Sequence, residues 1–121
     1  MGLYGRPILV VDDDAALRDV LSLTLLLEGY PVREAANGAE ALQLIEAEHP
    51  SLVVLDMQMP VLDGWGVARE LRARHLDPPI LVMTGGYNAQ RAAREIGADG
   101  FVGKPFGVAE LLDKVRALRV A

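Results

Sequence analysis

Short apolar runs alternate along this chain with longer stretches in which apolar residues recur every three or four positions. Residues 8–11, 52–55 and 80–83 are apolar throughout, a pattern typical of strands that are buried on both faces of a sheet. The less apolar segments 32–36 and 100–103 are weaker candidates for strands. The pattern predicts five short strands.

The stretches between these strands have helical spacing. In the first of them Leu17, Leu21 and Leu25 are four residues apart, and Gly29 follows as a stop signal. We expect helices over residues 15–28, 38–48, 65–75, 89–96 and 108–118. The fourth is expected to be the weakest, because its apolar stripe consists mostly of alanine.

Strands that alternate with helices predict an α/β fold, with a doubly wound, five-stranded parallel sheet of flavodoxin-like type covered by five helices. Ligands bind such sheets at the carboxyl ends of the strands. A chain of 121 residues fits one domain, so residues 1–121 are expected to form a single domain. The initial methionine and the short tail after residue 118 favour a stand-alone protein over an excised domain.

Composition narrows the functional classes. A net charge of −5 argues against direct binding to nucleic acid, and the lack of cysteine excludes disulfides and thiolate chemistry. No apolar run approaches the roughly 18 residues that a membrane span needs, and residues 1–7 are too short and too polar for a signal peptide. We therefore expect a cytoplasmic protein with no membrane partner.

Polar side chains stand where the predicted strands end. Asp12 and Asp13 follow the first strand and Asp56 follows the third. Thr84 follows the fourth strand, and Lys104, one of two lysines in the chain, follows the fifth. Because the carboxyl ends of parallel strands share one edge of a sheet, we expect these side chains to lie close together.

Three clustered carboxylates repel one another, and a divalent cation relieves the repulsion. A few oxygen ligands suit Mg²⁺ or Mn²⁺. With Lys104 as a second positive charge, Asp56 can act as a nucleophile toward phosphorus, and the Thr84 hydroxyl can hydrogen-bond a phosphoryl oxygen. The predicted product is an aspartyl phosphate.

Four motifs occur together in a fixed order. They are Ile8-Leu-Val-Val-Asp-Asp-Asp14, Asp56-Met-Gln-Met-Pro60 with Asp63-Gly64, Met83-Thr84-Gly85, and Phe101-Val-Gly-Lys-Pro-Phe106. Over essentially its full length the chain resembles the CheY-like receiver domains of two-component response regulators. The resemblance implies a signalling phosphoacceptor, which takes a phosphoryl group from a histidine kinase or histidine phosphotransfer protein and then changes its binding to a downstream target protein. The resemblance further implies that the protein is not an enzyme with an external substrate and catalyses only its own phosphorylation and dephosphorylation.

The resemblance also implies a metal site. Asp56 matches the phosphoacceptor of the family and a ligand of its Mg²⁺ ion. Asp13 matches the direct metal ligand, and Asp12 its partner acting through water. The backbone carbonyl of Gln58 matches a further ligand.

The same resemblance assigns the switching residues. Thr84 and Lys104 match the phosphate-sensing pair, and Phe101 matches the aromatic switch. The Lys104–Pro105 bond is expected to be cis, and proline is the usual site of cis bonds. The last helix resembles that of receivers that pair through it, so a homodimer through the last helices is one expected form of assembly.

One interval departs from the family pattern. Thr84 and Lys104 stand closer together in this sequence than is typical of receivers, so the segment between the last two strands is shortened. We expect residues 85–96 to be the least stable part of the fold, and phosphorylation to order them.

Simpler interpretations compete at several positions. Asp14 is best explained as a helix cap and Asp63-Gly64 as a turn. His49 and His75 are expected on the surface, and Trp65 is expected to cover apolar side chains.

Alternative functions also compete. A pseudo-receiver that only binds a partner would not need the residues for phosphorylation, and all of those residues are present here. A haloacid-dehalogenase-like phosphatase would match Asp12 and Asp14, but Ala16 stands where such enzymes have threonine or valine. A flavodoxin-type cofactor carrier is disfavoured because three aspartates would repel the cofactor's phosphate.

Overall fold

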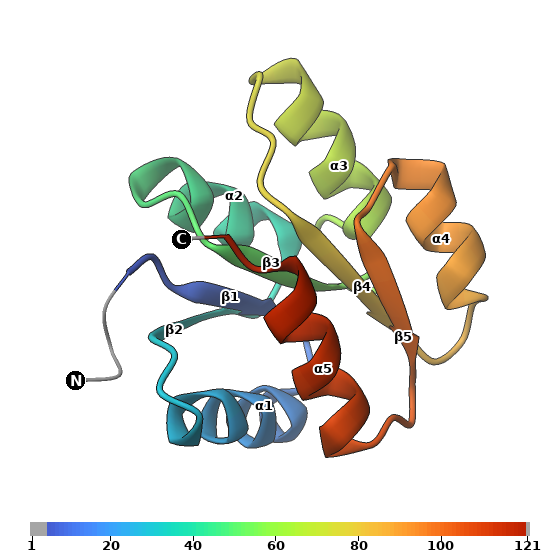
Figure 1. Cartoon of the computed structure of the whole chain (residues 1–121). Coiled ribbons are helices and arrows are strands. Elements are labelled where there is room, and N and C mark those ends of the chain that lie inside the picture. The colour runs from blue at the N-terminus through green and yellow to red at the C-terminus, as the bar shows by residue number, and fades with distance from the viewer. Residues whose placement is uncertain (1–4, 121) are drawn as a thin grey trace.

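The computed structural model describes residues 5–120, and strands and helices alternate through this range (Figure 1). The strands are β1 (Ile8–Val11), β2 (Val32–Ala35), β3 (Leu52–Asp56), β4 (Ile80–Thr84) and β5 (Gly100–Gly103). The helices are α1 (Ala15–Leu27), α2 (Gly38–Ala47), α3 (Gly64–Ala73), α4 (Ala89–Ile96) and α5 (Val108–Leu118). The predicted α/β fold and the order of its elements are confirmed.

All the strands form one parallel sheet in the order β2-β1-β3-β4-β5. β1 lies between β2 and β3, with Ile8 opposite both Val32 and Leu52. The connections that leave β1 and β3 therefore turn to opposite faces of the sheet, and a crevice opens between the carboxyl ends of these two strands.

Helices cover both faces of the sheet, α1 and α5 on one and α2, α3 and α4 on the other (Figure 1). Neighbouring strand residues supply opposite layers. Ile8 and Val10 pack with α1 and α5, whereas Leu9 and Val11 pack with the other three helices. This division explains why β1 is apolar throughout and why β3 and β4 are apolar up to their last residues, as is typical of parallel strands covered on both sides.

Side chains at the helix starts accept hydrogen bonds from the first free amides, as caps do. Asp14 caps α1, Asn37 caps α2, Asp63 caps α3 and Asn88 caps α4. The interpretation of Asp14 as a cap is thus confirmed, whereas Asp63, expected in a turn, is the cap of α3 and Gly64 is the first residue of that helix.

Some element ends differ from the predicted ones. α3 begins one residue early, at Gly64, because Asp63 is its cap. It ends at Ala73, before His75, whose φ of 57° cannot continue a right-handed helix. β3 and β4 each run one residue further than expected, to Asp56 and Thr84, so both polar side chains belong to the sheet itself.

The expected apolar stripe of α4 is buried and consists of Ala89, Ala92, Ala93 and Ile96. Gly97 ends the helix with a φ of 69°, in the left-handed region that glycine adopts without strain. No helix within residues 5–120 is long and apolar enough to cross a membrane.

Candidate functional site

The polar residues that the sequence places at strand ends meet at one edge of the sheet. Asp56 ends β3 and pairs in register with Met83, the residue before Thr84. Thr84 pairs in turn with Gly103, and the Lys104 amide donates to the Thr84 carbonyl at 2.9 Å. The parallel register alone therefore brings the ends of β3, β4 and β5 together.

Three carboxylates form the centre of the site. One oxygen from each of Asp12, Asp13 and Asp56 lies within 4.8 Å of the others. Asp12 and Asp56 are buried, and Asp13 is exposed. Oxygen atoms at this spacing fit a hard divalent cation such as Mg²⁺, and the exposed Asp13 leaves room for its water ligands. The donor set thus fits the predicted metal.

Lys104 bridges two of these acids. Its Nζ lies 2.7 Å from Asp12 Oδ2 and 3.5 Å from Asp56 Oδ2. Burial by itself would lower the pKa of Lys104, but the hydrogen bond to Asp12 and the negative charges of Asp56 and Asp12 outweigh it and raise that pKa. The ammonium therefore stays charged and holds its closer contact with Asp12.

At Asp56 the effect of burial on the pKa outweighs the effect of the neighbouring positive charge. Burial raises the pKa of Asp56 above its ordinary value, and the charge of Asp12 adds to the rise. Lys104 and the amide of Gln58, which lies 3.4 Å from Asp56 Oδ1, pull in the other direction without cancelling it. Lys104 alone thus does not offset the burial of Asp56 and the charge of Asp12, and a bound divalent cation would lower the pKa of Asp56.

Thr84 carries a hydroxyl without a partner. Its Oγ1 is buried and makes no hydrogen bond. Among the buried side-chain nitrogen and oxygen atoms of residues 5–120, only Thr84 Oγ1 and Ser22 Oγ lack a partner. A buried hydroxyl that makes no hydrogen bond costs about 1–3 kcal/mol. An oxygen of a bound ligand would remove this cost at Thr84, at the edge of the sheet where the carboxylates lie.

Phe101 lies on β5, partly buried against the core on the α4 side of the sheet. The ammonium of Lys114, on α5, stands 5.5 Å from the centre of its ring. The ring thus reaches from the core to the surface between α4 and α5. The Lys104–Pro105 bond is cis, as the resemblance predicted.

Sequence reasoning did not find Arg18. Its Nη1 donates to the Asp12 carbonyl at 2.6 Å, and its Nε lies 3.3 Å from Glu34 Oε1 on β2. The side chain thereby ties the loop that carries Asp12 to α1 and β2. Nothing in the sequence marks this contact, because arginine on an amphipathic helix is usually a surface residue.

Trp65 also has a role beyond the expected one. The side chain packs against the core, as predicted, but its indole N–H donates to Glu95 Oε1 at 2.9 Å. His49 and His75 are exposed, as expected.

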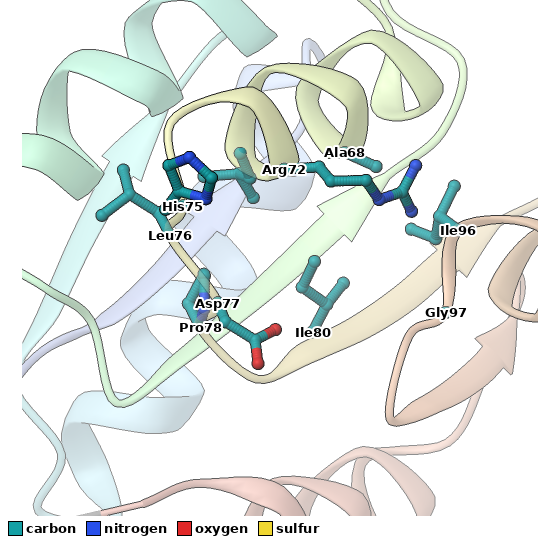
Figure 2. Close-up of a pocket in the computed structure, with 10 residues that line it drawn as sticks. Ala68, Arg72, His75, Leu76, Asp77, Pro78, Ile80, Ile96 and Gly97 are labelled. Atoms are coloured by element: carbon teal, nitrogen blue, oxygen red, sulfur yellow. The ribbon is translucent and has the colours of Figure 1, made fainter.

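A cavity of about 370 Å³ lies away from these residues (Figure 2). Arg72, His75 and Asp77 stand around a floor that includes Ile80 and Ile96. Ile80 is the first residue of β4 and Thr84 the last, so the cavity lies toward the opposite edge of the sheet. None of the residues that line it is one of the predicted site residues.

The fold and site agree with the comparison to known proteins. The chain matches the model of the response regulator receiver domain over residues 8–116. It therefore belongs to the response regulator receiver family, whose members act in two-component signalling.

Two curated relatives illustrate the match. Response regulator MprA of Mycolicibacterium vanbaalenii is 48% identical over 113 residues, which cover 92% of this chain and 49% of MprA. The probable transcriptional regulator ycf27 of Cyanophora paradoxa is 47% identical over 120 residues, which cover 98% of this chain and 50% of the relative. The chain thus spans about half the length of these relatives.

Solved structures agree. TrrA of Thermotoga maritima, solved in complex with Mg²⁺-BeF, has a TM-score of 0.81 and 38% identity, and the match covers 93% of this chain and 98% of TrrA. The chemotaxis protein CheY4 of Vibrio cholerae has a TM-score of 0.85 and 29% identity, over 95% of this chain and 99% of CheY4.

Proposed function

We propose that the protein accepts a phosphoryl group on Asp56 from the phosphohistidine of a histidine kinase or phosphotransfer protein. A carboxylate oxygen of Asp56 forms the new bond to phosphorus as the phosphorus–nitrogen bond breaks, and the histidine nitrogen keeps the electron pair. The observation that carries this proposal is the placement of the Asp56 carboxylate between an acid pair and an ammonium.

Asp12, Asp13 and Asp56 would hold the divalent cation, Mg²⁺ or Mn²⁺, together with the backbone carbonyl of Gln58. The bound cation supplies positive charge next to the phosphoryl oxygens. The carboxylate spacing and the raised pKa of Asp56 support this assignment. That TrrA was solved with Mg²⁺-BeF is consistent with it.

Lys104 and Thr84 would sense the product. The Lys104 ammonium moves from Asp12 toward a phosphoryl oxygen, and the unpartnered Thr84 hydroxyl donates a hydrogen bond to another. Phe101 then follows Thr84 and changes the surface between α4 and α5, where Lys114 lies over its ring. This surface would pass the signal to a downstream target protein.

Partner contact would use α1 beside the site. Val20 and Leu23 are each 59% exposed and Leu27 is 77% exposed. Their spacing places them on one side of the helix, as in helix–helix packing. A helical surface of the phosphoryl donor would cover this stripe.

The remaining assignments follow from the family. We propose one receiver domain over residues 1–121, located in the cytoplasm, whose output is protein binding rather than contact with nucleic acid or membrane. A homodimer through α5 is a further proposal. Neither the pseudo-receiver nor the phosphatase alternative gains support, because this family's chemical positions are all filled.

The test is phosphorylation with acetyl phosphate and Mg²⁺, followed by intact mass. One base-labile phosphoryl group is expected on the wild-type protein, and none on Asp56→Asn or after EDTA treatment. Asp77→Asn, an exposed acid toward the other edge of the sheet, serves as the control and should be labelled normally. Undiminished label on Asp56→Asn would refute the assignment.

A further inference from the structure

Three side chains beyond the phosphorylation site form a cluster that we call the aromatic latch: Trp65, Tyr87 and Glu95. The Glu95 carboxylate accepts the Trp65 indole N–H at 2.9 Å and the Tyr87 hydroxyl at 3.2 Å. The two rings meet edge to face, with their centres 5.2 Å apart and their planes at 88°. Each member therefore contacts both of the others.

The latch joins segments that are distant in the sequence. Trp65 lies in the first turn of α3, and Glu95 in the last turn of α4. Tyr87 belongs to the loop between β4 and α4. The latch thus fixes this loop to α3, from which it is separated in the chain by β4.

Only Gly85 and Gly86 separate Tyr87 from Thr84. A Cβ at Gly85 would lie 3.3 Å from Lys104 Cβ, and one at Gly86 would lie 2.6 Å from Gln58 Oε1. The loop passes close to both residues, and a side chain at Gly86 would have to displace the flexible amide end of Gln58. Paired glycines also leave the backbone unusually free, and ordering them is correspondingly unfavourable.

The latch is supported from α4 as well. Arg91 lies 5.9 Å from the centre of the Tyr87 ring and 3.5 Å from Glu95 Oε2. The hydrogen bond from Trp65, and then those from Tyr87 and Arg91, hold the pKa of Glu95 below its ordinary value. Glu95 is therefore an ionised acceptor at neutral pH.

We propose that Tyr87, held by Glu95 and Trp65, is a positioning residue for Thr84. The latch limits the freedom of the two-glycine link before a phosphoryl group arrives, so that the Thr84 hydroxyl is already near its place. This inference rests on the proposed function, because Thr84 needs positioning only if a phosphoryl oxygen is to bind there.

The decisive variant is Tyr87→Phe, which removes the hydroxyl and keeps the ring on Trp65. Restoring about half of the conformational freedom of one backbone residue should weaken binding of beryllofluoride with Mg²⁺, a mimic of the aspartyl phosphate, about three- to five-fold. The ¹⁹F NMR signals of the bound fluorides measure this affinity, and they do not depend on the fluorescence of Trp65 in the latch. The matched control is Tyr30→Phe, whose ring lies under Arg119 and whose affinity should equal that of the wild type.

Trp65, the sole tryptophan, checks the latch in the free protein, since Tyr87→Phe should change its emission and Tyr30→Phe should not. Adding Glu95→Gln to Tyr87→Phe should cause little further loss of affinity, because both residues act through one link.

Wild-type affinity, or tighter binding, in Tyr87→Phe would overturn the positioning role, whatever its melting temperature. If the wild-type protein itself bound no beryllofluoride, the proposed function would fail and the positioning role with it.

Discussion

Lys104 is shared unequally between Asp12 and Asp56, at 2.7 and 3.5 Å. The hydrogen bond of Lys104 goes to Asp12, and burial raises the pKa of Asp56 despite the attraction of the Lys104 ammonium. A phosphoryl group on Asp56 would bring new anionic oxygens, and Lys104 could move to them only if another cation took over Asp12. The metal and the lysine are therefore expected to act together.

Gly86 lies next to Gln58, two residues after Asp56 in the chain. A side chain at this position would first meet the amide end of Gln58, since a Cβ there lies 2.6 Å from Gln58 Oε1. That end is flexible and can move aside. We expect Gly86→Arg to screen the phosphoryl group from water and lengthen the phosphorylated lifetime by about ten-fold, or ~1.4 kcal/mol in the barrier. Loss of label after removal of acetyl phosphate measures this.

Two controls separate the causes of that effect. Gly107→Arg adds the same charge at a glycine with no atom within 4 Å of the added Cβ, and should leave the lifetime unchanged. Gln58→Ala removes the side-chain amide that an arginine at position 86 would displace, without adding the arginine, and so shows how much of the change in lifetime comes from the amide. A Gly86→Arg lifetime equal to that of the wild type would show that this position does not control the path of water.

The sequence predicts the site only as far as strand ends can be located. Asp56, Thr84 and Lys104 follow from parallel topology, since any such sheet brings them to one edge. The preference of Lys104 for Asp12, and the Arg18 contact with the Asp12 carbonyl, depend on the exact path of the loop after β1. Helical periodicity carries no information on that path.

At the level of elements, α4 is the segment that we expect to be least stable. Its buried residues are mostly alanines, whereas α3 buries Val67 and Leu71, so less apolar area stabilises α4. The aromatic latch adds contacts, but exposed hydrogen bonds and ion pairs contribute little. Amides of residues 90–96 should therefore exchange with solvent much faster than those of α3, and should slow when beryllofluoride and Mg²⁺ bind. Equal protection of the two helices in the free protein would contradict this.

The latch also shows where prediction of elements from the sequence stops. The apolar spacing predicts that α3 and α4 are helices. It does not show that Trp65 and Glu95, thirty residues apart, face each other. That contact depends on how the two helices pack side by side, which the spacing within each helix does not specify.

For the whole molecule, the cluster makes stability depend on pH and on metal. The raised pKa of Asp56 means that, without a divalent cation, the folded protein binds this proton more tightly than the unfolded chain does. Stability should then fall as the pH rises from the ordinary value of 3.8 through the folded-state pKa. A bound cation, which binds the folded state alone, reverses this loss.

Asp56→Asn tests this linkage, because the amide cannot ionise. In EDTA at pH 7 the variant should melt at a higher temperature than the wild type, and the difference should shrink as the pH falls below the raised pKa of Asp56, where the carboxyl regains its proton. Adding Mg²⁺ should raise the melting temperature of the wild type more than that of the variant, since the variant lacks one of the proposed ligands. The control is Asp77→Asn, which removes the same charge at a position toward the other edge of the sheet. Its melting temperature should equal that of the wild type under each of these conditions. A variant less stable than the wild type in EDTA at pH 7 would mean that the attraction of Lys104 outweighs burial and Asp12, and that the ionised Asp56 stabilises the fold.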